Sequence, residues 1–381
     1  MKIFPVILMA FFATSRFVAA ADAKKPPTRE EVQHAIERGL AFLQSQQKED
    51  GSWSAVDPNH PGLTALPLMA FQREPSGKYL KEQPAFMQKG YAFLRSKAQP
   101  DGGIYSMGLA NYNTSLAMMA LLNSGNPKDE PLIETAHNFI IGMQAKGMAN
   151  PSLDGGIGYG PNGTEHAHPD LDNTLIALEA LRAYKDKHPS VETEKGKDLD
   201  WNAAIAFITR CQNLPSANKE PWASGDPANK GGFIYFPGET RAGETKLPNG
   251  KVALRSYGTM SYAGLLSFIY ADLKKDDPRV ASALEWLKEN YTLDENPGLQ
   301  HAGLYYYYHL MSKGLAAAGV KELDLKDGRK IDWEPEFARK LISLQGSNGG
   351  WVNDTGRWME KDPILVTSYC VMALEIVIDR L

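Results

Sequence analysis

Residues 165–174 concentrate the side chains of this sequence that are best suited to chemistry. The segment reads Glu-His-Ala-His-Pro-Asp-Leu-Asp-Asn-Thr, so His166, His168, Asp170 and Asp172 stand at alternate positions. Imidazole nitrogens and carboxylate oxygens in this pattern suit Zn²⁺. Asp and Asn are also favoured helix N-caps, which gives Asp172 and Asn173 a purely structural interpretation. We therefore expect no cofactor, with a zinc ion at the two histidines and two aspartates as the alternative.

A second chemical signal is the run of four tyrosines at positions 305–308, followed by His309. Four consecutive positions cover every face of a helix, so one or two rings should face any central cavity. Aromatic faces stabilise cations, and they also stack on sugar rings. The alternative is that the rings pack between helices with their hydroxyls satisfied. Tyr305, Tyr308 and His309 are our candidate substrate contacts in this run.

The elements that must position these residues are helix pairs that repeat along the chain. Residues 38–53 predict the end of a helix followed by a turn, with a Gln, a Gly four residues later and a Trp two residues after that. The same spacing returns near the other end of the chain. The two copies are Gln47, Gly51, Trp53 and Gln345, Gly349, Trp351. Weaker helix–turn–helix copies lie between them, which makes six pairs.

Six such pairs predict one all-helical domain over residues 24–381. Each pair buries only one face and must stack on its neighbours to complete a core. Six pairs can close into a ring, which leaves no exposed end. The fourth pair contains an insertion in which β-prone runs at 231–236 and 251–254 flank a Pro-Asn-Gly turn. We expect a small β-hairpin there, as either a functional lid or a tolerated insertion.

The repeat pattern Arg/Lys-Gly-x-x-aromatic-Leu-x-x-x-Gln-x-x-x-Gly-x-Trp resembles the QW repeat of squalene–hopene cyclases and related triterpene cyclases. The same unit builds the β subunits of protein prenyltransferases. The resemblance implies an (α/α)6 toroid in which inner-helix N-termini face a central cavity. The Trp can then stack on the following inner helix while the Gln satisfies free backbone groups there. The polar ring around this mouth would contain His60, Thr64, Asn111, Asn113, Asp170, Asp172, Arg255, Tyr257, His301 and Thr367.

The same resemblance implies a general acid. In class II cyclases a D-x-D-D-T segment at this place protonates an alkene or epoxide, and its middle Asp is the donor. Residues 170–174 read Asp-Leu-Asp-Asn-Thr, so Asp172 matches the donor and Asp170 the first carboxylate. Asn173 replaces the last Asp. This change alters how the acid is tuned, because neighbouring hydrogen bonds set how readily a carboxyl releases its proton.

Net charge limits the classes of partner, and the N-terminal segment predicts the compartment. The chain has 381 residues, a formal net charge of −4 and no basic cluster, which argues against nucleic acid as a partner. Residues 1–23 combine an early Lys, an apolar run and an Ala-Asp-Ala site, the pattern of a signal peptide for a secreted or periplasmic protein. No later segment approaches the length of a membrane span. Cys211 and Cys370 lie in non-adjacent repeats, so we expect two free, buried thiols.

Three functions fit these features. The first is a terpene-cyclase-like enzyme that protonates an isoprenoid in the central cavity, with Asp172 as the acid. The second is a secreted (α/α)6 glycan-binding or polysaccharide-lyase-like protein that uses Arg255, Tyr308 and His309. The third is a non-enzymatic interaction module. The expected partner is thus a hydrophobic small molecule or a glycan, and the oligomeric state stays open.

Overall fold

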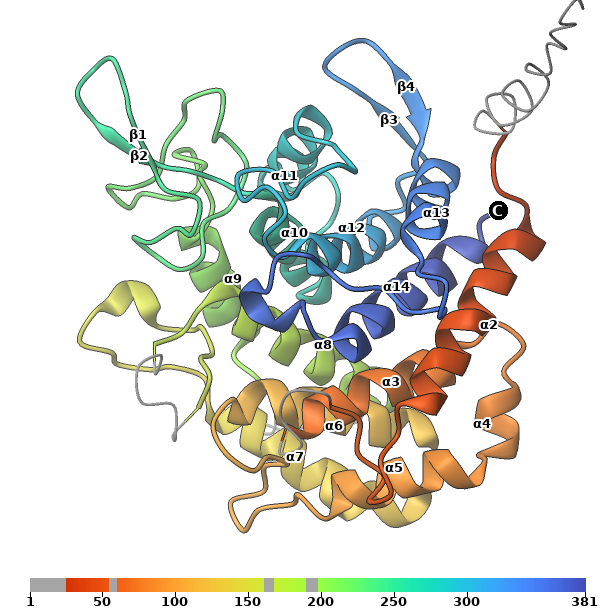
Figure 1. Ribbon diagram of the computed structural model, residues 1–381. Helices are drawn as coiled ribbons and strands as arrows, with labels where there is room; N and C mark the ends of the chain where they lie inside the picture. The colour runs from red at the N-terminus through yellow and green to blue at the C-terminus, as the bar shows by residue number, and fades with distance from the viewer. Residues whose placement is uncertain (1–24, 55–59, 161–167, 190–197) are drawn as a thin grey trace, which may run out of the picture.

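The computed structural model describes residues 25–54, 60–160, 168–189 and 198–381, and its helices form two concentric rings (Figure 1). Each inner helix contacts the next, and the last contacts the first, so the inner ring is closed. The inner helices are α3 (Pro61–Arg73), α6 (Ala110–Ser124), α8 (Leu171–Lys187), α10 (Gly258–Tyr270), α12 (Leu304–Ala317) and α14 (Pro363–Ile378).

The outer helices cover the inner ring and are amphipathic, whereas the inner helices are buried on nearly all sides. In α3, for example, every residue except Arg73 is buried, as expected for a helix enclosed by others. The fold is therefore the (α/α)6 toroid that the repeats predicted. The outer helices are α2 (Arg29–Ser45), α5 (Ala85–Arg95), α7 (Glu130–Gly142), α9 (Trp201–Arg210), α11 (Pro278–Glu289) and α13 (Trp333–Leu344), and the short helix α4 (Lys78–Glu82) links α3 to α5.

The glycine-containing turn that follows an outer helix contacts the next outer helix. In the third repeat the Gln144 amide donates to the carbonyl of Gly155 at 3.1 Å and to that of Asp200, the N-cap of α9, at 2.9 Å. Gly155 has φ +90°, and a Cβ there would lie 2.1 Å from the Ala203 carbonyl. The expectation that the Gln serves the following inner helix is therefore wrong, because its amide reaches the neighbouring outer helix.

A Thr hydroxyl, and not the Gln, bonds the turn to the inner helix. The Ile157 amide donates to Thr174 Oγ1 at 3.0 Å. The Trp53 amide donates in the same way to Thr64, and the Trp351 amide to Thr367. The turns of the first, third and sixth repeats are thus held to the next outer helix by a Gln and to their own inner helix by a Thr.

The same contacts close the ring between the last repeat and the first. The Gln345 amide donates to the Gly349 carbonyl at 2.8 Å and to the Ala35 carbonyl of α2 at 2.9 Å. A Cβ at Gly349 would lie 2.5 Å from the Arg38 carbonyl. Figure 1 shows the result: α2, in red, lies beside α13 and α14, in blue.

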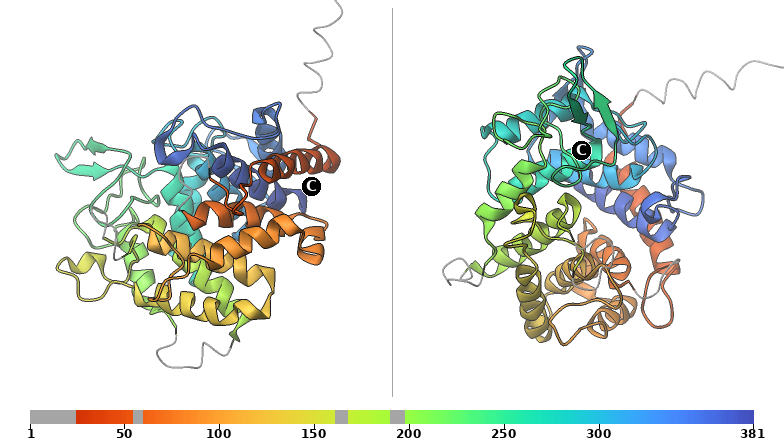
Figure 2. Two further views of the ribbon diagram at one scale, coloured as in Figure 1. Left: turned by 60° about the horizontal axis from the view of Figure 1, so that its bottom comes forward. Right: turned by 90° about the vertical axis from the view of Figure 1, so that its left-hand side faces the viewer.

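Two short hairpins extend from the rim of the ring (Figures 1 and 2). The hairpin expected in the fourth repeat is present, as β1 (Glu244–Lys246) paired with β2 (Val252–Leu254). Its first strand lies further along the chain than predicted, because Phe233 of the predicted run is buried in the core and pairs with Gln212 instead. The second hairpin, β3 (Glu322–Asp324) with β4 (Lys330–Asp332), was not predicted.

Both cysteines are buried and free, as expected. Among the described residues, no helix has the length and apolar character needed to cross a bilayer.

Candidate functional site

A cavity of about 500 Å³ lies where the N-termini of the inner helices converge. Its wall is rich in phenol rings and also contains His60, Asn113, Arg241, Arg357 and Trp358. A volume of this size is typical of a small-molecule site. The six tyrosines that line it are Tyr112, Tyr159, Tyr235, Tyr257, Tyr306 and Tyr369.

Asp172, in the first turn of α8, supplies the only carboxyl group among the described residues that line this cavity. Its Oδ1 accepts a hydrogen bond of 2.7 Å from the Tyr306 hydroxyl. Burial raises the pKa of Asp172 above its ordinary value, and the hydrogen bond from Tyr306 offsets part of that rise. Among the described lining residues, the cavity therefore presents one carboxyl that keeps its proton to a higher pH than an exposed Asp, with a donor that can stabilise the carboxylate.

Asp170 has a different role, although it is only two residues away. It is fully buried, and as the N-cap of α8 it accepts hydrogen bonds from the Asn173 backbone and side chain, both at 2.8 Å. Burial raises its pKa to about 7, with a further contribution from the charge of Asp172. The cap that we had considered for Asp172 and Asn173 is thus provided by Asp170, and Asp172 is left to face the cavity.

Asn173 completes this buried support. Its side-chain amide donates to Asp170, and its carbonyl accepts from Asn111 on the neighbouring helix α6 at 2.8 Å. Neither Asp170 nor Asn173 lines the cavity. Both residues therefore fix the orientation of the first turn of α8 and, through it, the position of Asp172.

The loop before α14 forms one wall of the mouth and was not identified from the sequence. Trp358 (φ 54°) and Met359 (φ 64°) adopt left-handed backbone conformations, and Trp358 is 47% exposed at the rim. Buried Glu360 accepts from the Tyr306 backbone amide at 2.8 Å and from Asn353, and burial raises its pKa to about 7. Glu360 thus fastens the mouth loop to the start of the helix that carries Tyr306.

The tyrosine run contributes one ring to the cavity, and it is Tyr306. Tyr305 and Tyr308 face away from it: they pack edge to face at 5.7 Å, and the Tyr308 hydroxyl donates to the Leu293 carbonyl. Their assignment as substrate contacts is wrong, because the pitch of α12 turns only one of the four positions toward the lumen. His309 lies deeper, stacked on Tyr369 at 5.1 Å, and burial lowers its pKa well below its ordinary value.

The predicted polar ring is only partly present at the mouth. Arg255 and His301 are exposed and do not line the cavity: the Arg255 amide donates to Gly243, and the His301 carbonyl accepts from Asn353. These two assignments are therefore wrong. Of the remaining members, His60, Asn113, Asp172 and Tyr257 line the cavity, while Thr64, Asn111, Asp170 and Thr367 are buried behind it.

The zinc alternative has no support from the residues that the structure describes. The His168 ring packs 4.2 Å from the Phe236 ring, and its Nδ1 lies 3.3 Å from the Pro169 carbonyl. Both oxygens of Asp170 are engaged by Asn173. No group of three His, Cys, Asp or Glu side chains in the described part of the chain converges as metal ligands. His166 lies outside the described residues, as does the predicted signal peptide at 1–23.

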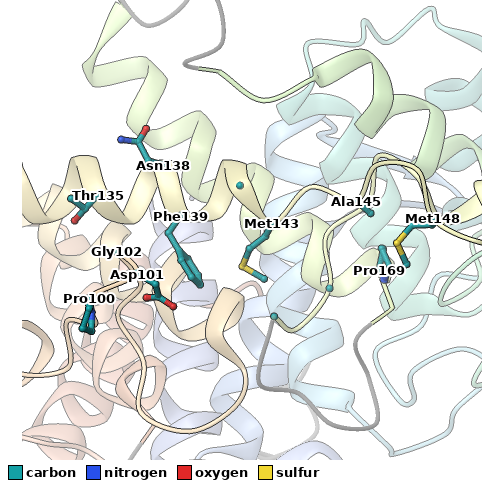
Figure 3. A pocket seen from close by; sticks show the side chains of 13 residues that line it. Pro100, Asp101, Gly102, Thr135, Asn138, Phe139, Met143, Ala145, Met148 and Pro169 are labelled. Atoms are coloured by element: carbon teal, nitrogen blue, oxygen red, sulfur yellow. The ribbon is translucent and has the colours of Figure 1, made fainter.

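A larger cavity of about 780 Å³ lies at the periphery, between α7 and the turns of the second and third repeats (Figure 3). Phe139, Met143 and Pro169 give it an apolar lining. Asp101, the one carboxylate among its described lining residues, is already bonded to the Tyr105 hydroxyl at 2.5 Å and to the Gly103 amide at 3.0 Å. The convergent polar groups lie in the central cavity, which is therefore the candidate active site.

Comparison with known proteins gives local sequence matches to terpene cyclases. No family model matches the chain. Squalene–hopene cyclase of Bradyrhizobium diazoefficiens is 28% identical over 184 residues, and the terpene cyclase/mutase ntnI of a Nectria species is 30% identical over 149 residues. These segments are 41% and 35% of this chain, but they span only 27% and 20% of the two relatives.

Solved structures share the fold over nearly the whole chain. A variant of the type II terpene cyclase MstE from Scytonema, in complex with geranylgeranyl dihydroxybenzoate, matches with a TM-score of 0.54 and 12% identity over 93% of this chain and 99% of that one. An inactive variant of the α-1,6-mannanase GH76A of Salegentibacter, in complex with α-1,6-mannotriose, matches with a TM-score of 0.56 and 12% identity. This match covers 91% of this chain and 99% of the mannanase chain. The chain is thus similar to terpene cyclases in sequence and fold, and to GH76 mannanases in fold alone.

Proposed function

We propose that this protein is a class II terpene-cyclase-like enzyme, which protonates a carbon–carbon double bond of an isoprenoid in the central cavity. The observation that carries the proposal is the Asp172 carboxyl, which alone among the described lining residues can release a carboxylic acid proton and is set in a wall of phenol rings. The sequence similarity to squalene–hopene cyclase supports the same chemistry. In this reaction Asp172 is the general acid, with Tyr306 as its hydrogen-bond donor.

The proposed step begins with Asp172 in its carboxylic acid form, which its raised pKa favours. The acid proton moves to one alkene carbon, and the π electron pair forms the new C–H bond. The other alkene carbon becomes a carbocation, and Asp172 becomes a carboxylate. The Tyr306 hydroxyl, 2.7 Å from Oδ1, stabilises that carboxylate as charge develops on it.

The rest of the wall suits the cation that follows. Ring faces attract positive charge, so tyrosines around the cavity can stabilise successive carbocations as rings close. Burial raises the pKa of Tyr257, Tyr306 and Tyr369 well above their ordinary values, so these phenols stay protonated and do not capture the cation as phenolates. Transfer of a proton from the last cation to water restores a double bond and ends the sequence, and a proton from solvent returns Asp172 to its acid form.

The glycan alternative has weaker support from the geometry. Glycoside hydrolysis generally needs two carboxyl groups on opposite sides of the scissile bond. Among the described lining residues this cavity offers Asp172 alone, and the nearby carboxyl of Asp170 is bonded on both oxygens by Asn173. None of the three residues proposed for a lyase, Arg255, Tyr308 and His309, lines the cavity. The apolar and phenolic wall favours an isoprenoid.

The test is turnover of polyprenes by the purified mature protein. Squalene and C15–C20 polyprenyl compounds are incubated with the wild type and with Asp172→Asn, Tyr306→Phe and Asp101→Asn, and products are identified by gas chromatography–mass spectrometry. Cyclic products should be lost in Asp172→Asn, reduced about tenfold in Tyr306→Phe, and unchanged in Asp101→Asn at the peripheral cavity. Absence of turnover across all isoprenoids by folded wild-type protein would remove the proposal.

Export is a separate proposal that rests on residues 1–23 alone. Fractionation of the producing cell, with N-terminal sequencing of the recovered protein, tests it: a mature chain beginning near position 24 outside the cytoplasm is expected, and an intact Met1 in the cytosol contradicts it.

A further inference from the structure

We infer that the isoprenoid bound by this cavity carries an anionic head group, and that Arg241 and Arg357 hold this oxyanion at the mouth. The inference rests on the proposed function for the identity of the tail, and it specifies the substrate class. A neutral hydrocarbon such as squalene would offer these two guanidinium groups no hydrogen-bond acceptor, whereas a carboxylate or phosphate would.

The cavity has a polar mouth and an aromatic deep end. Tyr112, Tyr306 and Tyr369 line both this cavity and a chamber of about 20 Å³ further down the lumen, so these rings mark the deep end. Asp172 is bonded to Tyr306 and therefore lies at that end. The mouth is formed by the exposed residues Arg357 and Trp358. The two ends are thus suited to different parts of an amphiphile.

Both arginines are held in place by aromatic rings. The Arg241 guanidinium lies 4.5 Å from the centre of the Tyr235 ring, and the Arg357 guanidinium lies 4.2 Å from the centre of the Trp358 ring. A stacked guanidinium keeps its N–H groups at the edge of the plane, where they can bind two oxygens of one carboxylate or phosphate. The arginines come from two different segments, one after the fourth turn and one before α14.

Asp172, Arg241, Tyr257 and Arg357 line the same cavity. The pKa of the Tyr257 phenol is raised chiefly by burial and further by the charge of Asp172, and it is lowered by both Arg241 and Arg357. Tyr257 therefore lies within electrostatic range of the acid and of both cations. An amphiphile with its head at the arginines extends past Tyr257 toward Asp172, which orients its tail for protonation.

The positive charge of the mouth is only partly neutralised by the protein. Glu239 pairs with Arg241 at 2.6 Å, and its side chain is 43% exposed. No carboxylate in the described part of the chain pairs with Arg357. A ligand oxyanion can therefore bind Arg357 directly and share Arg241 with Glu239. The exposed Arg255, which lies outside the cavity, offers a matched control for the loss of one positive charge.

The test compares three ligands with the same tail: geranylgeranic acid, geranylgeranyl monophosphate and geranylgeraniol. Their dissociation constants are measured by isothermal titration calorimetry for the wild type and for Arg241→Gln, Arg357→Gln, Arg255→Gln and Asp172→Asn. An anionic ligand, carboxylate or phosphate, should bind the wild type at least tenfold more tightly than the alcohol. Arg241→Gln and Arg357→Gln should each reduce this ratio several-fold and leave alcohol binding unchanged, whereas Arg255→Gln should preserve the ratio.

The outcomes separate this inference from the proposed function. Equal affinity of the wild type for the alcohol and both anions overturns the inference, as does an equal loss of the ratio in Arg255→Gln. Asp172→Asn should keep the preference for anions while turnover is lost. A clear preference for anions without turnover of any isoprenoid supports the head-group site and removes the cyclase proposal. Turnover of neutral hydrocarbons without a preference for anions supports the cyclase proposal and removes the head-group site.

Discussion

Asp170 and Asp172 are two neighbouring carboxyl groups to which different environments give different roles. Both carboxyl groups belong to the start of α8, and both are desolvated. Asp170 is occupied by the amides of Asn173 and positions the helix, whereas Asp172 meets one phenol and the empty space of the cavity. The replacement of the last Asp of the cyclase motif by Asn173 therefore provides a neutral donor to Asp170. It leaves Asp172 as the only acid that faces the cavity among the described residues.

Glu360 supports a prediction about pH and stability. Burial raises its pKa to about 7, above the ordinary 4.5 of an unfolded chain. Its stabilising contribution is thus fully present below pH 4.5 and is lost as the pH rises through 7, by at most about 3 kcal/mol. The Gln side chain of the Glu360→Gln variant has no proton that titrates in this range, so the variant lacks this pH-dependent contribution. The free energy of unfolding of the wild type, relative to the variant, should therefore fall between pH 4.5 and 7.5.

Urea unfolding of both proteins across this pH range measures the difference. Asp170 and Glu334, whose pKa values are also raised to about 7, contribute equally to both proteins and cancel in the comparison. Parallel pH profiles for the wild type and Glu360→Gln would show that the carboxyl is not the titrating group.

At the scale of elements, the repeated turn is the unit that builds the ring. Its Gly lets the backbone of the next outer helix approach, its Gln bonds to that helix, and a Thr or Ser of the inner helix binds the turn from inside. The fourth turn follows the same rule with Phe233 in place of Trp, since its amide donates to Ser261 at 3.1 Å. The backbone contact with the inner helix is therefore retained in a turn that lacks the tryptophan.

Ring closure should depend on Gly349. Its φ is +89°, and a Cβ would lie 2.5 Å from the Arg38 carbonyl, so Gly349→Ala adds a backbone clash between the last and first repeats to the left-handed strain. Gly250→Ala is the matched control, because Gly250 has φ +83° and no atom within 4 Å of the added Cβ. The strain alone costs roughly 1–2 kcal/mol. Gly349→Ala should lose at least twice as much as Gly250→Ala in urea unfolding, and equal losses would contradict the closure contact.

At the scale of the whole molecule, a buried ion pair lies below the candidate active site. The Lys313 ammonium on α12 bonds to Glu179 on α8 at 2.5 Å, and the two side chains are only 8% and 11% exposed. Burial lowers the pKa of Lys313 from its ordinary value. The α10 helix lies between α8 and α12 along the ring, so this ion pair connects helices that are not adjacent in chain order. Both residues line the small chamber of about 20 Å³ beneath the tyrosines.

Removing one partner of this ion pair should destabilise the protein more than replacing both partners. Glu179→Gln leaves the Lys313 charge buried without its partner, for which we expect a loss of about 3–5 kcal/mol in the free energy of unfolding. The double variant Glu179→Leu/Lys313→Met replaces both charges with apolar groups and should recover most of that loss. Urea unfolding of the single and double variants provides the measurement. A double variant as unstable as Glu179→Gln would mean that the pair itself holds the two helices together.

The sequence by itself predicted the repeat and the number of helix pairs, because hydrophobic periodicity and turn spacing are local properties. The closed ring was implied by the resemblance to the QW repeat. The sequence also identified the segment that contains Asp172, through the resemblance of residues 170–174 to the cyclase motif. Only the tertiary structure decided which of two neighbouring carboxyls faces the cavity, that Tyr306 is the ring of its run that reaches it, and that Glu360 and the two arginines join the site. Those residues come from distant segments, and a side chain's direction depends on how whole helices pack, which residue spacing along one segment does not encode.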